Sequence, residues 1–259
     1  MTTDAILLLD VGNSHIFAGV SIDNDIVCRF RYDTKSAVSS DQLGVFLRSV
    51  LRENDISHKD IASVAICSVV PQLDYSLRAA IVKYFSLEPF ILQAGVKTGL
   101  KINVNNPQEV GSDQIAGCIA AEHEFPRCDK IIVDFGTATT ICALSAKAEY
   151  LGVSILPGVR ASMEALFQNA AKLPVVEIKK PGRVLGKHTV ECIQSGIYYG
   201  NLAAVKSLID QVGREVFKAK PIVIASGGFS QLFADESLYD HRREDLVLEG
   251  LRLAILNCL

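Results

Sequence analysis

Two segments of this chain share one pattern, and their spacing constrains the fold more than any other feature of the sequence. Residues 6–14 read ILLLDVGNS and residues 130–138 read KIIVDFGTA, with equivalent positions 124 apart. Each copy is an apolar run, an Asp-x-Gly sequence, a small polar residue and a second apolar run, which is typical of a strand, a tight turn and a returning strand. At the same spacing the match continues as an apolar stretch to Ser21 and Ser145.

A repeat separated by half the chain length predicts two related domains, each of which holds one turn toward a shared nucleotide cleft. The rest of the pattern favours an α/β fold, because an apolar β-branched run over 61–70 predicts a buried strand that is parallel to its neighbour. We place the boundary near Gly111, which divides the chain into domains 1–112 and 113–259.

The remaining periodicity predicts alternating strands and helices. Strands are expected over 26–32, 89–92 and 221–226, and helices over 41–53, 73–85, 113–126, 158–171 and 189–212. Ser40 or Asp41 is the expected cap of the first helix. Gly196 and Gly200 lie four residues apart in the longest helix. They either allow another helix to approach closely or only weaken their own helix.

Composition excludes several classes of function. Apolar residues make up 49% of the chain, charged residues 21%, and the net charge is −3, so we expect no nucleic-acid partner and no membrane partner. The first residues lack the positive charge of a signal peptide, and no apolar run is long enough to span a bilayer. The seven cysteines include no Cys-x-x-Cys pair, which favours a reducing cytoplasm.

An Asp-x-Gly turn after a strand is suited to phosphate binding. Glycine lets backbone N–H groups approach a phosphate closely, and a carboxylate beside the turn can hold Mg²⁺ through water. Four short polar side chains add hydrogen-bond donors, namely Asn13, Ser14, Thr137 and Thr139. The alternative is an Asx-turn that only closes a hairpin. Because the motif is duplicated and a third strand runs into Gly227-Gly228, we favour the nucleotide site.

Two further positions have both a structural and a functional interpretation. Gly227-Gly228 either lets a nucleotide lie against bare backbone or supplies a turn with positive φ. Asp113 either complements the dipole of the helix that it begins or acts as a base in phosphoryl transfer. The sequence contains neither a Gly-x-x-x-x-Gly-Lys-[Ser/Thr] motif nor a Gly-x-Gly-x-x-Gly motif, which disfavours the folds that use them.

Short motifs spread in order along nearly the whole chain resemble those of one enzyme family. They are Asp10–Ser14, Ser68–Pro71, Glu109–Asp113, Asp134–Thr140, Pro157-Gly158, Leu173-Pro174, Gly186–Thr189, Ser195-Gly196 with Tyr199-Gly200, and Gly227-Gly228. Together they are similar to type III pantothenate kinases. The resemblance implies the acetate and sugar kinase/Hsc70/actin fold, with two ribonuclease-H-like domains around the nucleotide, and a cytoplasmic homodimer.

The resemblance also implies roles for individual residues. The expected reaction moves the γ-phosphoryl group of ATP to the primary hydroxyl of pantothenate, the first step of coenzyme A biosynthesis. Asp113 would be the general base, Asp10 would hold Mg²⁺ through water, and Asp134 would bind a monovalent cation, K⁺ or NH₄⁺. The residues implied to contact ATP are Asp10, Val11, Gly12, Asn13, Ser14, His15, Ile16, Phe17, Thr137, Gly227 and Gly228. Those implied to contact pantothenate are Val104, Gly111, Ser112, Asp113, Gln114 and Thr189.

The chain departs from the family pattern on the pantothenate side. Gln114 follows Asp113 where the family usually has Arg, and Val104 stands where it usually has Tyr. Arg pairs with a carboxylate more strongly than Gln does, so these changes predict roughly tenfold weaker pantothenate binding. Two alternatives therefore stay open: a kinase of the same fold with a different small-alcohol acceptor, and a non-catalytic relative that binds nucleotide.

Overall fold

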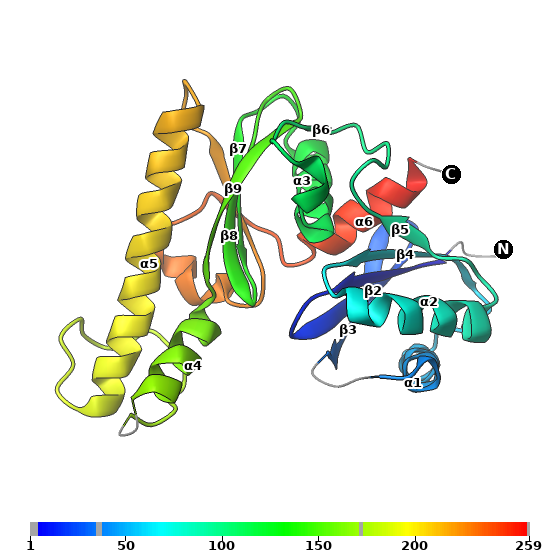
Figure 1. Cartoon of the computed structure of the whole chain (residues 1–259), viewed down its shortest axis with the longest axis horizontal. Coiled ribbons are helices and arrows are strands. Elements are labelled where there is room, and N and C mark those ends of the chain that lie inside the picture. Colours follow the sequence, from blue (N-terminus) through cyan, green and yellow to red (C-terminus); the bar gives the residue numbers. More distant parts are fainter. Residues whose placement is uncertain (1–4, 35–37, 171–172, 258–259) are drawn as a thin grey trace. The chain divides into compact units, whose positions relative to one another are not determined.

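The computed structural model describes residues 5–34, 38–170 and 173–257, so Cys258 and Ala171, the last residue of one expected helix, lie outside the described residues. The chain forms two compact units, which Figure 1 shows with their elements labelled. Unit 1 comprises Met1–Leu100, Asn105–His123 and Leu246–Leu259, and unit 2 comprises Lys101–Val104 and Glu124–Asp245.

This division differs from the expected boundary at residues 112 and 113, because two helices from beyond that boundary belong to unit 1. They are α3 (Ser112–Glu124) and α6 (Leu246–Leu256). The helices meet backbone to backbone, since a Cβ atom on Gly250 would lie 1.8 Å from the carbonyl oxygen of Ala116. Only glycine permits so close an approach.

Unit 1 is built on a five-stranded sheet in the order β3-β2-β1-β4-β5. Its strands are β1 (Ala5–Val11), β2 (His15–Ile22), β3 (Asp25–Asp33), β4 (Ile61–Ser68) and β5 (Phe90–Leu92). The first three strands are antiparallel, whereas β4 and β5 run parallel to β1. The expected buried parallel strand after residue 60 is therefore confirmed.

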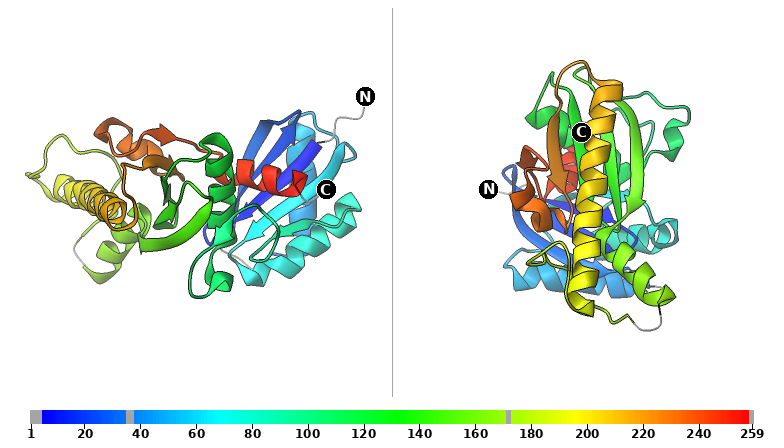
Figure 2. Two further views of the ribbon diagram at one scale, coloured as in Figure 1. Left: turned by 90° about the horizontal axis from the view of Figure 1, so that it is seen from above. Right: turned by 90° about the vertical axis from the view of Figure 1, so that its left-hand side faces the viewer.

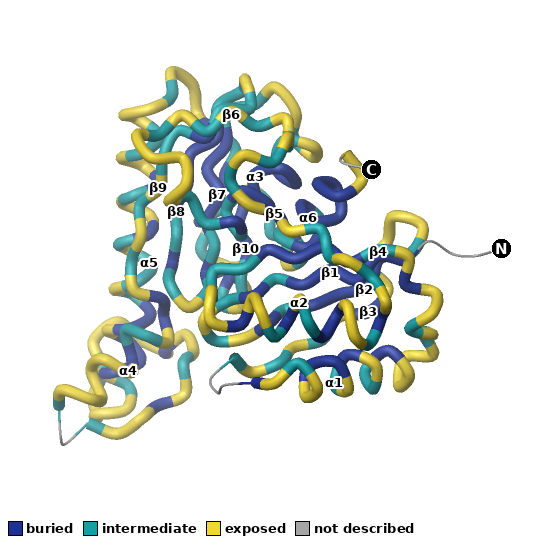
Figure 3. Tube along the Cα trace, turned by 45° about the vertical axis from the view of Figure 1, so that its right-hand side comes forward, coloured by how far each residue is buried: buried dark blue, intermediate teal, exposed yellow. Residues whose placement is uncertain are grey.

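The apolar character of β1 follows from its place in the sheet, since both of its faces are covered. Alternate residues such as Leu7 and Leu9 pack with α1 (Ser40–Glu53) and α2 (Pro71–Phe85). The opposite face, which carries Leu8, lies under α6, as Figure 2 shows. Figure 3 shows β1 as one of the most continuously buried segments of unit 1.

The cap of α1 differs from the expectation. Ser39, not Ser40 or Asp41, is the N-cap residue, and it forms a capping box with Gln42. The Ser39 hydroxyl accepts the backbone N–H of Gln42 at 3.2 Å, and the Gln42 side-chain oxygen accepts the backbone N–H of Ser39 at 3.0 Å. The reciprocal bond requires Gln three residues after the cap, and only Ser39 has it.

Unit 2 repeats the strand order of unit 1. Its strands are β6 (Lys101–Ile102), β7 (Lys130–Phe135), β8 (Ala138–Leu144), β9 (Glu149–Pro157), β10 (Ile222–Ser226) and β11 (His241–Arg242). Strands β9-β8-β7-β10-β11 correspond to β3-β2-β1-β4-β5, and β6 is added beside β9. The duplication that the sequence predicts is thus present in the sheets themselves.

Helices α4 (Val159–Asn169) and α5 (Thr189–Val216) cover one face of the second sheet. The 28 residues of α5 run alongside the strands, as Figure 2 shows. Short 3₁₀ helices span Pro107–Glu109 in unit 1 and Ser230–Glu236 in unit 2. No helix among the described residues has the length and apolar character needed to cross a bilayer.

The spacing of 124 does not hold through both hairpins, which corrects the predicted match of Ser21 with Ser145. Ile6 pairs with Ser21, but Lys130, its counterpart, pairs with Leu144. The second turn is therefore one residue shorter than the first. A shift of one residue turns every side chain of a strand to the other face of the sheet.

Gly196 and Gly200 do not serve as a helix contact within the chain. A Cβ atom on either glycine would meet nothing within 4 Å. Among the described residues, nothing packs against these two positions of α5.

Candidate active site

The turn between β1 and β2 is held from several sides. The backbone N–H of Gly12 donates to the carbonyl of His15 at 3.0 Å. Thr34, which follows β3, donates from its hydroxyl to the carbonyl of Asn13 at 2.7 Å and from its N–H to the carbonyl of Ser14 at 3.1 Å. These bonds fix the shape of the turn, as a phosphate-binding loop requires.

Side chains around this turn differ in burial and charge, and therefore in how they could contact a nucleotide. Val11 and Ile16 are buried in the core of unit 1, so only their backbone groups are available. Asn13 and His15 are exposed, and His15 lies 3.0 Å from the Asp33 carboxylate. The Arg31 guanidinium lies 4.4 Å from the ring centre of Phe17. A positive charge is thus held beside the returning strand, where anionic phosphate is expected.

Asp10 lies at the carboxyl end of β1, directly opposite Cys67 of the neighbouring parallel strand. The Cys67 thiol donates a hydrogen bond to the Asp10 carboxylate, with 3.4 Å between the sulfur and Oδ1. Burial raises the pKa of Cys67 well above its usual range, and the charges of Asp10 and Asp113 raise it further. The thiol therefore stays protonated and remains a donor.

The start of α3 brings Asp113 to the same end of the sheet. The Ser112 hydroxyl donates to the carbonyl of Ser68, the last residue of β4, at 3.0 Å. This bond anchors the start of the helix at the end of β4, next to Cys67, which stands opposite Asp10 in the sheet. The charges of both Asp10 and Asp113 act on the Cys67 thiol. Unit 1 thus brings two carboxylates to the Asp-x-Gly turn between β1 and β2.

The environment of Asp113 combines both interpretations from the sequence. Its carboxylate accepts the backbone N–H of Gln114 at 2.7 Å, a bond at a helix start. Burial nevertheless raises the pKa of Asp113, and hydrogen bonds from the backbone lower it by less. A Cβ atom on Gly111 would lie 2.4 Å from the Asp113 carboxylate, so the glycine makes room for this side chain.

The second Asp-x-Gly turn, in unit 2, is packed by three glycines. A Cβ atom on Gly227 would lie 2.6 Å from one carboxylate oxygen of Asp134, and a Cβ atom on Gly136 would lie 2.9 Å from the other. A Cβ atom on Gly158 would lie 2.3 Å from the carbonyl oxygen of Thr137. A side chain at any of these three positions would collide with the Asp134 carboxylate or with the carbonyl of Thr137.

The Gly227-Gly228 turn follows directly from the pairing of β10 with β7, which sets Ser226 opposite Asp134. Gly227 has φ of +85°, which favours glycine, whereas no side chain or backbone atom lies within 4 Å of a Cβ atom on Gly228. The turn needs the first glycine for its conformation. Both Gly228 and Thr137 are exposed on this unit.

The expected pantothenate residues divide between the units. Gly111, Ser112, Asp113 and Gln114 lie together at the start of α3 in unit 1, whereas Val104 and Thr189 belong to unit 2. Within unit 2, Val104 follows β6 and the exposed Thr189 begins α5. Figure 1 shows β6 and this end of α5 at opposite ends of the unit.

The donor sets fit hard cations. Mg²⁺ usually keeps several waters and needs one or two carboxylates together with substrate phosphates, which a single residue such as Asp10 satisfies. A larger monovalent cation suits the Asp134 carboxylate, beside which Gly136 and Gly227 carry no side chain. The described residues contain no group of three or more His, Cys, Asp or Glu side chains that could hold a metal by themselves.

The sequence alone did not reveal three residues that shape the site. Cys67 donates to Asp10 from the neighbouring strand, and Thr34, which follows β3, donates to the first turn. Gly158 packs against the second turn. Of the three, only Gly158 belonged to a motif of the family resemblance, and that motif did not indicate its contact with the second turn.

A family model described as type III pantothenate kinase matches residues 6–211. A type III pantothenate kinase of Legionella pneumophila (strain Paris) is 58% identical over 252 residues, which cover 97% of this chain and 98% of that protein.

Two solved structures are similar in fold at low sequence identity. A Campylobacter jejuni protein assigned to the Baf family of transcriptional activators has a TM-score of 0.61 and 18% identity, covering 97% of this chain and 98% of that one. MreB 5 of Spiroplasma citri bound to AMPPNP has a TM-score of 0.53 and 11% identity, covering 99% of both chains. These likenesses confirm the predicted α/β fold of the actin-like ATPases and sugar kinases.

Proposed function

The chain belongs to the type III pantothenate kinase family, and we propose that it transfers the γ-phosphoryl group of ATP to the primary hydroxyl of pantothenate, the first step of coenzyme A biosynthesis. The observation that carries this proposal is the grouping of Asp10, Cys67 and Asp113 beside the Gly12 turn in unit 1. Phosphoryl transfer needs positioning and charge stabilisation more than covalent chemistry by the protein. Such a turn with two adjacent carboxylates can supply both.

We assign the general base to Asp113. Its burial raises the pKa, which makes the carboxylate a stronger proton acceptor than an exposed aspartate. It would accept the proton of the pantothenate hydroxyl as that oxygen attacks the γ-phosphorus. The neighbouring Gly111, Ser112 and Gln114 would line the pantothenate site.

The nucleotide would be held by backbone more than by side chains. Residues 10–17 would contact the ATP phosphates, and Thr137, Gly227 and Gly228 would also bind ATP. Asp10 would hold Mg²⁺ through water, and Asp134 would hold K⁺ or NH₄⁺. Bound cations neutralise phosphate charge as the γ-phosphoryl group moves.

Two alternatives account for Gln114 and Val104 standing in place of the family's Arg and Tyr. One is a kinase of the same fold whose acceptor is a different small alcohol. The other is a non-catalytic nucleotide-binding relative. The retention of Asp10, Asp113 and Asp134 favours an active kinase, since a protein that only binds nucleotide has no need of a base.

We further propose that the protein is a cytoplasmic homodimer. No described residue packs against Gly196 or Gly200 on α5. Large apolar side chains are exposed in the same unit, among them Phe167 on α4 and Leu185 before α5. Burial of such side chains in a second copy would stabilise an interface. None of the cysteines that the structure describes forms a disulfide, as in a reducing compartment.

Release of ADP by the purified protein tests the proposed reaction. With ATP, Mg²⁺ and K⁺ present, turnover should require pantothenate, and replacement of K⁺ by Na⁺ should lower it. Turnover with another alcohol but not with pantothenate would favour the first alternative. ATP binding without turnover on any acceptor would favour the second.

A further inference from the structure

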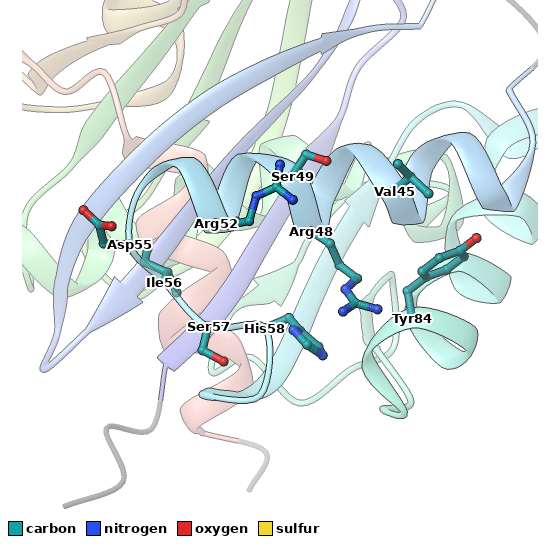
Figure 4. Close-up of a pocket in the computed structure, with 9 residues that line it drawn as sticks. All are labelled: Val45, Arg48, Ser49, Arg52, Asp55, Ile56, Ser57, His58 and Tyr84. Carbon is teal, nitrogen blue, oxygen red and sulfur yellow. The ribbon is translucent and has the colours of Figure 1, made fainter.

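A cavity of about 580 Å³ in unit 1 is lined by an unusual set of polar side chains. It lies between the carboxyl half of α1, the loop that follows it and Tyr84 of α2, as Figure 4 shows. Its volume is in the range of small-molecule sites. The lining residues are Val45, Arg48, Ser49, Arg52, Asp55, Ile56, Ser57, His58 and Tyr84.

The wall formed by Tyr84 is built into the packing of α1 on α2. A Cβ atom on Gly44 would lie 2.1 Å from the Tyr84 ring, so the ring packs directly against the backbone of α1. The Tyr84 hydroxyl donates to the Asp41 carboxylate at 2.9 Å, and Lys83 donates to the same carboxylate at 2.6 Å. The shape of the cavity at this end is therefore held in place.

Arg48 provides the main charge of the cavity. Within the described part of the chain its guanidinium makes no hydrogen bond or ion pair, and Figure 4 shows it extending toward His58 and Tyr84. Arg52, one turn further along α1, pairs with Glu53 at 3.1 Å, but both side chains are exposed. Exposed pairs contribute little, so Arg52 is free to turn toward a ligand.

The groups around Arg48 complement an anion. His58 is half-buried with its ring against Phe85, and burial lowers its pKa. The positive charges of Arg48 and Lys59 lower the pKa of His58 further, whereas Asp60 raises it. Ser57 accepts the N–H of Lys59 at 3.2 Å, and its O–H proton is available to a ligand. Asp55, the acidic lining residue, lies at the other end of the cavity in Figure 4.

This cavity cannot belong to the proposed ATP site. It adjoins the residues that precede β4, whereas Cys67 and Ser68 stand at the other end of that strand, beside Asp10. The seven residue-to-residue steps of extended chain from Ile61 to Ser68 span roughly 23 Å at 3.3 Å per residue. Both places lie in unit 1, so the separation is a property of one unit.

We propose that this cavity, between α1 and α2, is a second binding site of the protein, which takes the phosphate group of a small phosphorylated molecule. Arg48 would bind the phosphate oxygens, with Ser57 and His58 donating beside it, because a guanidinium matches phosphate geometry. The adjoining Val45 and Ile56 would contact the apolar part of the molecule.

Histidine signals in NMR spectra separate this site from the proposed ATP site. The probe is inorganic phosphate, titrated against chloride at equal ionic strength. His15 stands at the turn between β1 and β2, and His58 lines the cavity, so each site has its own reporter. We expect the His58 signal to shift saturably and its pKa to rise, since a bound anion stabilises the imidazolium.

Arg48→Gln should weaken the His58 response by tenfold or more and leave the His15 response intact. Arg78→Gln is the matched control, because Arg78 is an exposed arginine of α2 that pairs with Glu88 outside the cavity. It should respond as the wild type does.

Three outcomes would overturn the proposal. They are the absence of a His58 shift, a shift that chloride reproduces, and a shift that survives Arg48→Gln. A phosphate response at His58 but not at His15 would support the second site and count against the proposed phosphate turn. The opposite result would leave the proposed function standing and remove the second site.

Discussion

The thiol of Cys67 donates to the carboxylate of Asp10 across 3.4 Å, from one strand of the sheet to the next. Cys67 is fully buried, so its bond is shielded from water. Burial also keeps the thiol protonated, because it raises the pKa of Cys67. The bond thus orients the side chain that we propose as the Mg²⁺-holding carboxylate.

Cys67→Val should therefore raise the Mg²⁺ concentration needed for half-maximal turnover. The loss of a hydrogen bond worth about 0.5–1.5 kcal/mol corresponds to roughly a two- to tenfold change. Cys67→Ser keeps a donor and should stay close to wild type, and Cys28→Val is a buried control on β3. An unchanged Mg²⁺ requirement in Cys67→Val would rule out this positioning role. Direct titration of Mg²⁺ and an ATP analogue should show the same order.

Asp113→Asn should lower turnover by about 10²-fold or more, as expected for the loss of a general base. Its thermal unfolding temperature at neutral pH should not fall, because the wild type buries a carboxylate that is costly to ionise. The pKa of Asp113 is raised above its ordinary value of 3.8, so the folded state binds more protons than the unfolded state between the two values. Stability from this group is therefore present at low pH and lost as pH rises through that window.

The same shift predicts a pH profile for the wild type. kcat/KM should fall on the acid side with an apparent pKa above that of an exposed aspartate, because only the ionised Asp113 accepts a proton. The acid limb should be absent from the residual activity of Asp113→Asn. A variant that loses activity together with its folded structure would identify Asp113 as structural.

Gly227→Ala should raise the K⁺ concentration required for activity. The new methyl group would lie 2.6 Å from Asp134 Oδ1 and would occupy a φ of +85°, which costs about 1–3 kcal/mol in a non-glycine residue. Gly228→Ala is the matched control, because no atom lies within 4 Å of its Cβ position. Equal K⁺ dependence in the two variants would argue against a cation beside Asp134.

Thr139→Val should stabilise the protein. Among the described residues, the Thr139 hydroxyl is the buried side-chain group that lacks a hydrogen-bond partner. Its replacement by a methyl group of similar shape removes a desolvation cost of about 1–3 kcal/mol. Thr140→Val, on the more exposed face of the same strand, should change stability by less than about 0.5 kcal/mol. Urea unfolding with an unchanged m-value measures both changes.

Gln114→Arg should lower the KM for pantothenate by roughly tenfold, because Arg makes a charged, bidentate hydrogen bond to a carboxylate. Gln114 lies in the first turn of α3, next to the proposed base. Gln108→Arg adds the same charge on an exposed residue of the preceding 3₁₀ helix and serves as the control. A similar fall in KM for both variants would indicate general electrostatic attraction and not direct recognition.

Local patterns were sufficient to predict much of this protein. Both Asp-x-Gly turns follow strands as expected, and Asp113 begins a helix, because apolar periodicity and turn residues act over a few positions. The sequence also predicted the duplicated sheets and the family. These features depend on residues that lie close together in the chain or recur at one spacing.

Other features were decided only by pairing between distant segments. The second hairpin turns one residue earlier than the first, so Thr139 takes the place of the buried Ile16 and its hydroxyl faces the core. The constant spacing of 124 in the sequence does not reveal this shift, because the second strand of each hairpin is apolar in either alignment.

The bond between Cys67 and Asp10 likewise depends on the register of β4 against β1, and α6 joins unit 1 through contacts with segments more than a hundred residues away. Local sequence specifies which residues form a strand or helix and which faces are apolar. It does not specify which distant face covers them, because that choice depends on how well the whole set of side chains packs together.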